Sequence, residues 1–294
     1  MPDGLPEQGE GGLLASHAEV LVINDGTAAA GRLSQAAALA WIERWDYQQQ
    51  TYLPDREERF TALIDVVAEA AGRPDPLVLD LGCGPGSLAV RLLDRLPGAT
   101  VVAIDADPVL LALGTAAWPG RPGLRFADAD FRIPGWTRGL GLGELWPDRQ
   151  ADAAVSTTAL HWLAVPELTA MYAELVTALR SGGVLLNGDQ LEEDEKIAPT
   201  LARLGSALIA REEQRRFPGG HGENWADWWI AVLADPALAA PRAERDRRRH
   251  SAGHHQPETL WLHSHVAALQ AAGFTEIGTL WQRGSNRLLC AVAG

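Results

Sequence analysis

Cysteine, basic residues and long apolar runs are all scarce in this chain. Its 294 residues include only two cysteines, Cys83 and Cys290, too few for a disulfide framework, so we expect a protein of the reducing cytoplasm. The 25 lysines and arginines are outnumbered by 38 aspartates and glutamates, and the net charge of -13 would repel a nucleic-acid backbone. No apolar run approaches the ~20 residues that span a bilayer, and the N-terminus lacks the basic and apolar segments of a signal peptide. We therefore expect neither nucleic acid nor a membrane as a partner.

Apolar residues and tryptophan, by contrast, are plentiful. Apolar residues make up 47% of the chain, enough for a sizeable core, and the length suits one domain with additions or two small domains. Eleven tryptophans stand against three tyrosines. Because an indole offers a wide apolar surface, a cavity lined by aromatic rings is one explanation. Additional core packing is the simpler one.

The chain is organised around residues 77–87. Residues 77–81, Leu-Val-Leu-Asp-Leu, form an apolar run typical of a strand buried on both faces of a parallel sheet. Gly82, Gly84 and Gly86 follow, and Ser87 begins a helical pattern. Glycine permits positive φ and close approach of a ligand, and a helix start offers free N–H groups and a positive dipole end. The stretch predicts a ligand cradle, although its third glycine comes one residue too early for the Gly-x-Gly-x-x-Gly fingerprint of dinucleotide-binding folds.

Strand and helix patterns then alternate along the chain. Four further apolar, β-rich runs occupy residues 99–104, 124–127, 152–157 and 184–187. Helical patterns separate them, and this alternation predicts an α/β fold with a doubly wound, mostly parallel sheet. Two last runs, 274–281 and 287–292, are separated by a short turn, which predicts an antiparallel pair.

Asp80 and the three glycines form the pattern Asp-x-Gly-x-Gly-x-Gly, which resembles motif I of the class I S-adenosylmethionine-dependent methyltransferases. The terminal strand pair is similar to that of the same family, in which the seventh strand is reversed and lies between the fifth and sixth. The resemblance covers about residues 33–187 and 259–294. It implies a seven-stranded sheet with an antiparallel last strand and a helical lid and cap insertion. It also implies S-adenosylmethionine as cofactor and S-adenosyl-L-homocysteine as its product.

The resemblance places the cofactor at the tips of the first strands. Asp80 is expected near the methionine amino group, with tying down the glycine turn as its competing role. Asp105, about twenty residues past that turn, is expected to accept from the ribose hydroxyls rather than to act only as a helix cap. Asp128 is expected to accept from the adenine amino group, beside a backbone N–H that reads a ring nitrogen. The other expected cofactor residues are Gly82, Cys83, Gly84, Gly86, Ala129, Thr157, and Ala106 and Phe131 flanking the adenine.

His161 is the candidate catalytic base. A neutral imidazole is available at physiological pH, and His161 follows the fourth predicted strand, whose tip should face the acceptor. The alternatives are a hydrogen bond within its own loop and a role in shaping the pocket. The residues expected to contact the acceptor or to lie in a lid are Tyr47, Tyr52, Thr158, Trp162, Trp225 and Trp229. For the two tyrosines, packing between helices is an equally good explanation.

The expected organisation has five parts. They are a flexible tail at residues 1–32, a helical lid at 33–72, the cofactor-binding core at 73–187, a substrate-cap insertion at 188–257, and a helix with two strands completing the sheet at 258–294. Within the insertion, the basic run 242–250 is most simply a solvated face.

A metal is not expected. His221, His254 and His255 lack the spacing of known metal motifs. Ser156 and Thr157 stand where catechol-type relatives carry a metal-binding aspartate, and the Asp/Asn-Pro-Pro-Tyr motif of nucleic-acid methyltransferases is missing there. The prediction is therefore metal-independent methyl transfer to an oxygen, nitrogen or carbon of a small molecule. The alternatives are an NAD(P)-dependent oxidoreductase and a fold relative that binds the cofactor without methylating. The sequence leaves open a monomer or a homodimer.

Overall fold

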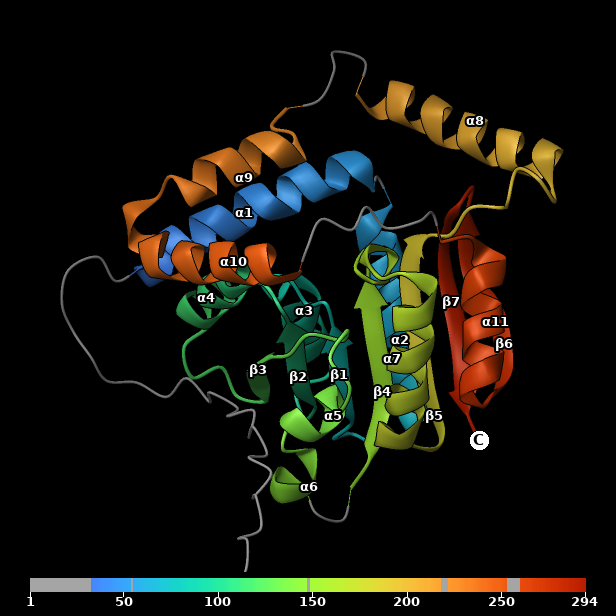
Figure 1. The fold of residues 1–294 in the computed structure, drawn as a ribbon, viewed down its shortest axis with the longest axis horizontal. Coiled ribbons are helices and arrows are strands. Elements are labelled where there is room, and N and C mark those ends of the chain that lie inside the picture. The colour runs from blue at the N-terminus through green and yellow to red at the C-terminus, as the bar shows by residue number, and fades with distance from the viewer. Residues whose placement is uncertain (1–32, 54, 147–148, 218–221, 253–259) are drawn as a thin grey trace, which may run out of the picture.

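One seven-stranded sheet forms the centre of the molecule. The computed structural model describes residues 33–294 apart from residue 54 and residues 147–148, 218–221 and 253–259 (Figure 1). The tail predicted at residues 1–32 lies outside the described residues. The strand order is β3-β2-β1-β4-β5-β7-β6. The strands are β1 (Leu77–Leu81), β2 (Thr100–Asp105), β3 (Leu124–Asp128), β4 (Ala151–Thr157), β5 (Leu179–Gln190), β6 (Phe274–Arg283) and β7 (Asn286–Ala293).

Strand β7 decides the topology. Strands β1 to β5 pair in parallel, whereas β7 runs antiparallel to both of its neighbours, β5 and β6. Arg283 pairs with Asn286 across a turn formed by Gly284 and Ser285. The reversed last strand between the fifth and sixth, and with it the predicted fold class, is confirmed.

The register of the parallel strands assembles one functional edge. All five residues of β1 are buried, and Asp80 lies opposite Ala103 of β2 and Val155 of β4. Asp105, at the end of β2, lies opposite Asp128, at the end of β3. Because parallel strands end at the same edge, the glycine turn and the expected acidic tips lie side by side.

Helices cover both faces of the sheet. On one face, α7 (Val165–Ala178) and α11 (Leu262–Ala272) share a core with Leu79 and Leu185. On the other face, α2 (Arg56–Ala71) and α3 (Ser87–Arg95) share a core with Val78 and Leu186. Residues 132–150 contain two short helices, α5 (Trp136–Gly139) and α6 (Leu142–Leu145).

The segment predicted as a helical lid divides into two different helices. Helix α1 (Gln35–Tyr52) lies above the carboxyl ends of the strands beside α9 (Figure 1). Helix α2, however, buries Phe60, Leu63 and Val67 against the sheet. Its apolar stripe requires that position, so α2 belongs to the core rather than to a lid.

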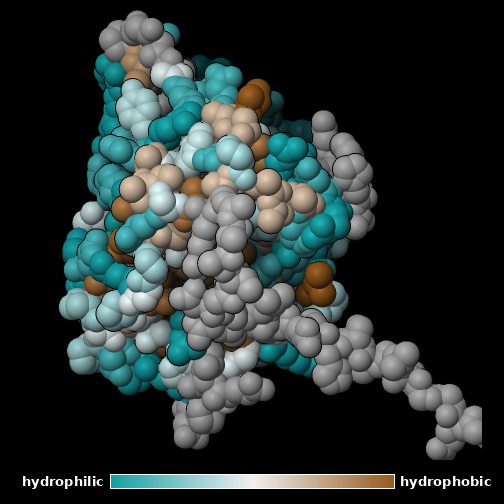
Figure 2. Space-filling view, turned by 90° about the vertical axis from the view of Figure 1, so that its left-hand side faces the viewer, coloured by the Kyte–Doolittle hydropathy of each residue, from teal (hydrophilic) through white to brown (hydrophobic). Residues whose placement is uncertain are grey.

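The insertion after β5 also divides. Helix α9 (Trp225–Leu233) shares an aromatic and aliphatic core with α1 and α4 (Pro108–Ala117), and α10 (Ala239–Ala252) packs against α4. Helix α8 (Pro199–Arg216) stands apart, near the turn between β6 and β7 (Figure 1). The described residues visible on the side of the molecule that faces the viewer in Figure 2 are mostly hydrophilic, with small apolar patches between them.

Strand β5 is longer than predicted. The sequence predicted it at residues 184–187. Helix α7 ends at Ala178, and β5 runs from Leu179 to Gln190, so the strand includes Gly182 and Gly183. The pairing of β5 with β4 is irregular here: Leu179 lies opposite Ala151, and the register shifts before the pairing continues beyond Gly182 and Gly183. Within the described residues, no helix is both long and apolar enough to cross a membrane.

Candidate active site

The three glycines of the turn after β1 serve different purposes. Their φ angles are +69°, +56° and +91° at Gly82, Gly84 and Gly86. A Cβ at Gly82 would lie 2.2 Å from the Cβ of Ala159, and one at Gly86 would lie 2.9 Å from the ring of Phe126. Protein packing therefore explains two of the glycines that the sequence assigned to a ligand. Only Gly84 has room, since its nearest neighbour is the ring of Trp45 on α1, at 3.6 Å.

The N–H groups of this turn are satisfied internally. Gly82 and Cys83 both donate to the carbonyl of Ile104, at 2.8 and 2.9 Å, and Gly86 donates to the carbonyl of Cys83 at 3.0 Å. Gly84 donates to Oδ2 of Asp105 at 2.7 Å. The expectation of free N–H groups is wrong for these four residues. A pyrophosphate needs such free donors, so this geometry disfavours the dinucleotide alternative.

Asp105 fastens the turn. Its Oδ1 also accepts from the N–H of Asp107 at 2.8 Å, while Asp107 itself caps α4 by accepting from Val109 at 2.9 Å. The helix-cap role considered for Asp105 thus belongs to Asp107. Burial raises the pKa of Asp105 to about 6, against the backbone hydrogen bonds that lower it. Each oxygen of Asp105 retains acceptor capacity, because a carboxylate offers about four lone-pair sites.

The groups expected to read adenine are held by protein partners. Arg248 of α10 donates to Oδ1 and Oδ2 of Asp128, both at 2.7 Å, and to the carbonyl of Ala106 at 2.9 Å. The N–H of Ala129 donates to the carbonyl of Asp105 at 3.1 Å, so it is not free for a ring nitrogen. Phe131 packs edge-on against Trp136, with ring centroids 4.9 Å apart.

A second arginine attaches α10 to the same edge. Arg245 donates to Oδ2 of Asp107 at 2.5 Å and lies 4.0 Å over the ring of Trp229. The basic run is therefore not only a solvated face. Two of its arginines clamp the insertion onto the tips of β2 and β3.

On the acceptor side, His161 has a partner that the sequence did not suggest. Its Nδ1 lies 3.0 Å from both carboxylate oxygens of Asp189, at the end of β5. The Asp189 side chain is 1% exposed, whereas that of His161 is 38% exposed. Burial alone would lower the pKa of His161, but the hydrogen bond and charge of Asp189 outweigh it and raise the pKa. Burial alone would raise the pKa of Asp189, but His161 and Arg59 lower it.

Arg59 of α2 crosses the sheet edge beneath this pair. It donates to Oδ1 of Asn286 at 2.6 Å and to Oγ1 of Thr157 at 2.5 Å. A Cβ at Gly188 would lie 2.8 Å from Nε of Arg59, so a glycine makes room for the guanidinium. Desolvation lowers the pKa of Arg59 to about 10. Thr157, predicted to contact the cofactor, instead has its hydroxyl bound by Arg59.

The loop after β4 is backbone-strained. Thr158 has φ of +51°, the one positive value at a non-glycine residue in the described part of the chain. Its N–H donates to the carbonyl of Gly188 at 3.0 Å. Strained residues of this kind cluster at functional sites, where the surrounding structure must hold them. The short helix η1 (Leu160–Trp162), which carries His161, follows directly after this residue and Ala159.

The predicted acceptor aromatics fall into two groups. Trp162 stacks on Trp225 with ring centroids 6.2 Å apart and planes at 25°, and both are exposed. Trp229 is buried and packs edge-on against Trp45 and Trp228. Tyr47 is exposed on α1, whereas the side chain of Tyr52, which ends α1, lies outside the described residues. The structure therefore brings Trp162 and Trp225 together and uses Trp229 to join α9 to α1.

Comparison with known proteins finds similarity to methyltransferases. The sequence model of a family described as a methyltransferase domain matches residues 78–183. The chain is 27% identical over 194 residues to a trans-aconitate 2-methyltransferase of Methylobacterium radiotolerans, a match covering 66% of this chain and 61% of that protein. It is 33% identical over 141 residues to one of an Azoarcus species, covering 48% of this chain and 49% of that protein. Residues 78–183 of the chain are therefore similar to a methyltransferase domain.

Two facts limit what these similarities show. The chain spans about half to three-fifths of the length of the relatives it matches. Among solved structures, human N-acetylserotonin methyltransferase in complex with S-adenosylmethionine is similar over 89% of this chain and 57% of that chain, with a TM-score of 0.50 and 16% identity. At that identity the likeness shows the fold alone.

Asp80 fits the cofactor that the resemblance implies. The carboxylate is fully buried, and neither oxygen has a hydrogen-bond partner among the described residues. Burial, and secondly the charge of Asp105, raise the pKa of Asp80 to about 8, while the backbone N–H of Ala89 lowers it. A buried carboxylate without a partner is costly. A cationic ligand such as the methionine moiety of S-adenosylmethionine would supply the missing partner.

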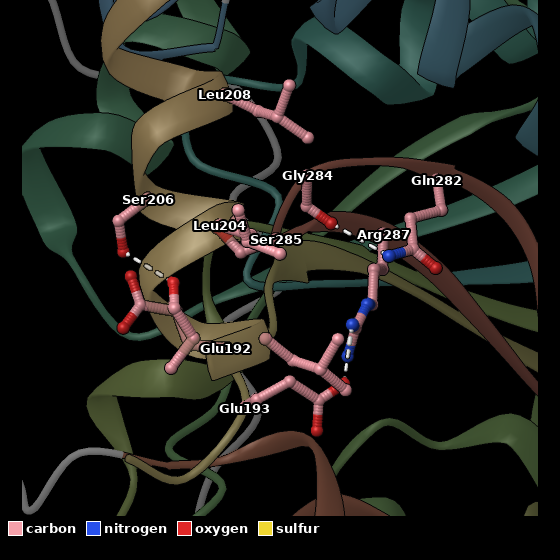
Figure 3. A pocket seen from close by; sticks show the side chains of 12 residues that line it. Glu192, Glu193, Leu204, Ser206, Leu208, Gln282, Gly284, Ser285 and Arg287 are labelled. Atoms are coloured by element: carbon pink, nitrogen blue, oxygen red, sulfur yellow. Dashed lines mark hydrogen bonds and ion pairs between the residues drawn. The ribbon is translucent and has the colours of Figure 1, made fainter. Parts of the chain in front are cut away.

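The described residues also line a cavity away from the glycine turn. It has a volume of about 280 Å³ and lies between α8, Glu192 and Glu193, and the turn joining β6 to β7. Figure 3 shows Arg287 extending along its wall to Glu193, with which it pairs at 2.7 Å. Across residues 33–294 with the stated gaps, no group of three histidine, cysteine or acidic residues could hold a metal. His221, His254 and His255 lie outside the described residues.

Proposed function

We propose that this protein transfers the methyl group of S-adenosylmethionine to a small-molecule acceptor, at oxygen, nitrogen or carbon and without a metal. The observation that carries the proposal is Asp80, which is buried without a partner beside a glycine turn whose N–H groups are already bonded. That combination suits a cationic cofactor better than a phosphate-bearing one. The family model supports it, because residues 78–183 match a methyltransferase domain.

The chain's own residues would bind the cofactor, orient the acceptor and remove a proton from it. When bound, S-adenosylmethionine supplies an electrophilic methyl group. Asp80 and Asp105 would hold the cofactor at the tips of β1 and β2. His161 would take a proton from the acceptor, and Thr158 and Trp162 would orient the acceptor. Correct positioning contributes up to ~7–11 kcal/mol to such reactions, and a placed base contributes a factor of about 10²–10⁴.

The remaining assignments are parts of the same proposal. Helix α1 and the α9–α10 unit would serve as lid and cap over the strand tips. The acceptor would be a small molecule and not a nucleic acid, given the net charge of -13. The protein would work in the cytoplasm, as a monomer or a homodimer.

Calorimetry with S-adenosylmethionine, S-adenosyl-L-homocysteine and NADH tests the proposal directly. We expect heat from the first two ligands and none from NADH. Asp105→Ala should weaken cofactor binding, whereas Asp94→Asn, on the exposed end of α3, should not. Binding of NADH alone would support the oxidoreductase alternative. Cofactor binding without methyl transfer to any acceptor in a broad panel would support the non-methylating alternative.

A further inference from the structure

We infer that Asp189 is a positioning residue that makes His161 a general base, and that the acceptor is a flat aromatic compound with an ionisable hydroxyl rather than a polycarboxylate. The inference rests on the proposed methyl transfer and names the substrate class of that same site. The relatives above are named for trans-aconitate, a polycarboxylate. The acceptor side of this chain carries different chemistry.

The geometry sets the tautomer of His161. Both oxygens of Asp189 lie 3.0 Å from Nδ1, and one of them also accepts from the N–H of Gln190 at 2.8 Å. A carboxylate that remains ionised binds the protonated Nδ1, which leaves Nε2 as the basic nitrogen. Because Asp189 is buried and His161 is partly exposed, the imidazole is anchored on one edge and accessible elsewhere.

The charges around the pair keep Asp189 ionised. The positive charge of Arg59, on α2, lowers the pKa of Asp189. The hydrogen bonds of that guanidinium go to Asn286 and Thr157. From α7 and α11, Tyr172 and His265 face the same carboxylate, joined to each other by a hydrogen bond of 2.9 Å. Burial raises the pKa of Tyr172 and lowers that of His265 to about 4. Both are therefore neutral at pH 7.

A base of this kind suits a hydroxyl and not a carboxylate. A carboxylate is already a nucleophile at neutral pH, gains nothing from proton removal, and would meet the negative charge of Asp189. A hydroxyl is a weak nucleophile until its proton leaves. Its oxygen forms the bond to the methyl carbon, and the carbon–sulfur bond breaks with its electron pair remaining on sulfur. The hydroxyl proton passes to Nε2 of His161 and from there to solvent.

The walls beside His161 suit a flat ring. The ring of Trp162 lies 5.1 Å from that of His161, centroid to centroid, and stacks on Trp225. Trp162 is 58% exposed and Trp225 39% exposed. The exposed indole of Trp162 beside a base favours an aromatic acceptor, because offset stacking adds to apolar burial.

The first test measures His161 without any acceptor. Imidazole proton resonances are titrated in the wild type, in Asp189→Asn and in Asp189→Glu, with His161→Asn used to assign the signal. We expect the pKa of His161 to lie above 6.5 in the wild type, to fall by about one unit or more in Asp189→Asn, and to be largely restored in Asp189→Glu. Asp65→Asn, a surface pair with Arg95, is the matched control. An unchanged pKa in a folded Asp189→Asn would overturn the positioning role.

The second test compares acceptors that share a ring. Transfer of labelled methyl from S-adenosylmethionine is measured with 2-naphthol, 2-naphthoate and trans-aconitate. We expect 2-naphthol to be methylated at least tenfold faster than either carboxylate. We also expect the acid limb of its kcat profile to move to lower pH in Asp189→Asn. Faster transfer to 2-naphthoate or trans-aconitate, with cofactor binding intact, would overturn the acceptor class and leave methyl transfer standing. Absence of cofactor binding in calorimetry would instead overturn the proposed function.

Discussion

The guanidinium of Arg248 holds the carboxylate of Asp128 through two parallel hydrogen bonds of 2.7 Å. The two residues lie 120 positions apart in the chain, on α10 and at the tip of β3. Asp128 is the residue expected to accept from adenine, and Arg248 also binds the carbonyl of Ala106 beside it. Cofactor binding in the expected manner therefore competes with the attachment of α10. This competition can be measured.

Arg248→Gln should tighten cofactor binding. Partly exposed ion pairs of this kind contribute about 0.2–1 kcal/mol, so removing the competitor should lower the Kd for S-adenosylmethionine by up to about fivefold in calorimetry. Arg247→Gln is the matched control, because Arg247 pairs with Glu244 on the same helix rather than with Asp128. Weaker binding in Arg248→Gln would mean that this arginine contacts the cofactor instead of competing with it.

Asp80→Asn should stabilise the protein without cofactor while weakening cofactor binding. In the unfolded chain Asp80 ionises above about pH 4, whereas in the folded protein burial raises its pKa to about 8. The folded state thus keeps a proton that the unfolded state loses, and stability falls as pH rises from about 4 to 8. Denaturant unfolding at pH 5, 7 and 8.5 should show Asp80→Asn more stable at pH 7 by up to about 4 kcal/mol. Equal pH dependence in both proteins would contradict the buried, unpartnered carboxylate.

Gly82→Ala should destabilise the fold through a clash rather than through φ alone. The new methyl group would lie 2.2 Å from the Cβ of Ala159, and both strain and overpacking cost about 1–3 kcal/mol. Gly120→Ala is a close control, with φ of +66° and nothing within 4 Å of the added atom. Thermal unfolding should rank Gly82→Ala below Gly120→Ala by at least about 1 kcal/mol. Equal losses of stability in the two variants would show that the loop containing Ala159 can move away from the glycine turn.

Trp162→Ala should affect acceptor binding more than stability. The indole is largely exposed, so the free energy of unfolding should change by less than about 1 kcal/mol. Loss of a stacking surface should raise the KM for 2-naphthol by about three- to tenfold with a smaller change in kcat, because stacked aromatic pairs contribute about 0.5–1.5 kcal/mol. Ile230→Ala, on an exposed apolar residue of α9, should leave both parameters unchanged. A loss confined to kcat would place Trp162 with the reacting atoms instead.

Local patterns in the sequence determined the elements of the fold and much of its topology. The apolar run at 77–81, the glycines after it and the short turn before β7 each reflect backbone preferences that act over a few residues. They predicted the central strand, the edge where the site lies and the antiparallel last pair. The division between α1 and α2 was missed, because both helices are amphipathic and the pattern does not say which surface each one covers.

Only the tertiary structure decided which side chains meet at the site. Asp189 lies beyond the predicted end of its strand, and Arg248 stands in a basic run that resembles a solvated face. Neither Asp189 beside His161 nor Arg248 on Asp128 has a local signature, because each pair joins segments brought together by sheet register and helix packing. The sequence by itself therefore determined the central strand, the glycine turn after it and the reversed last pair. The packing of distant segments decided which carboxylates are paired and which imidazole lies beside a buried carboxylate.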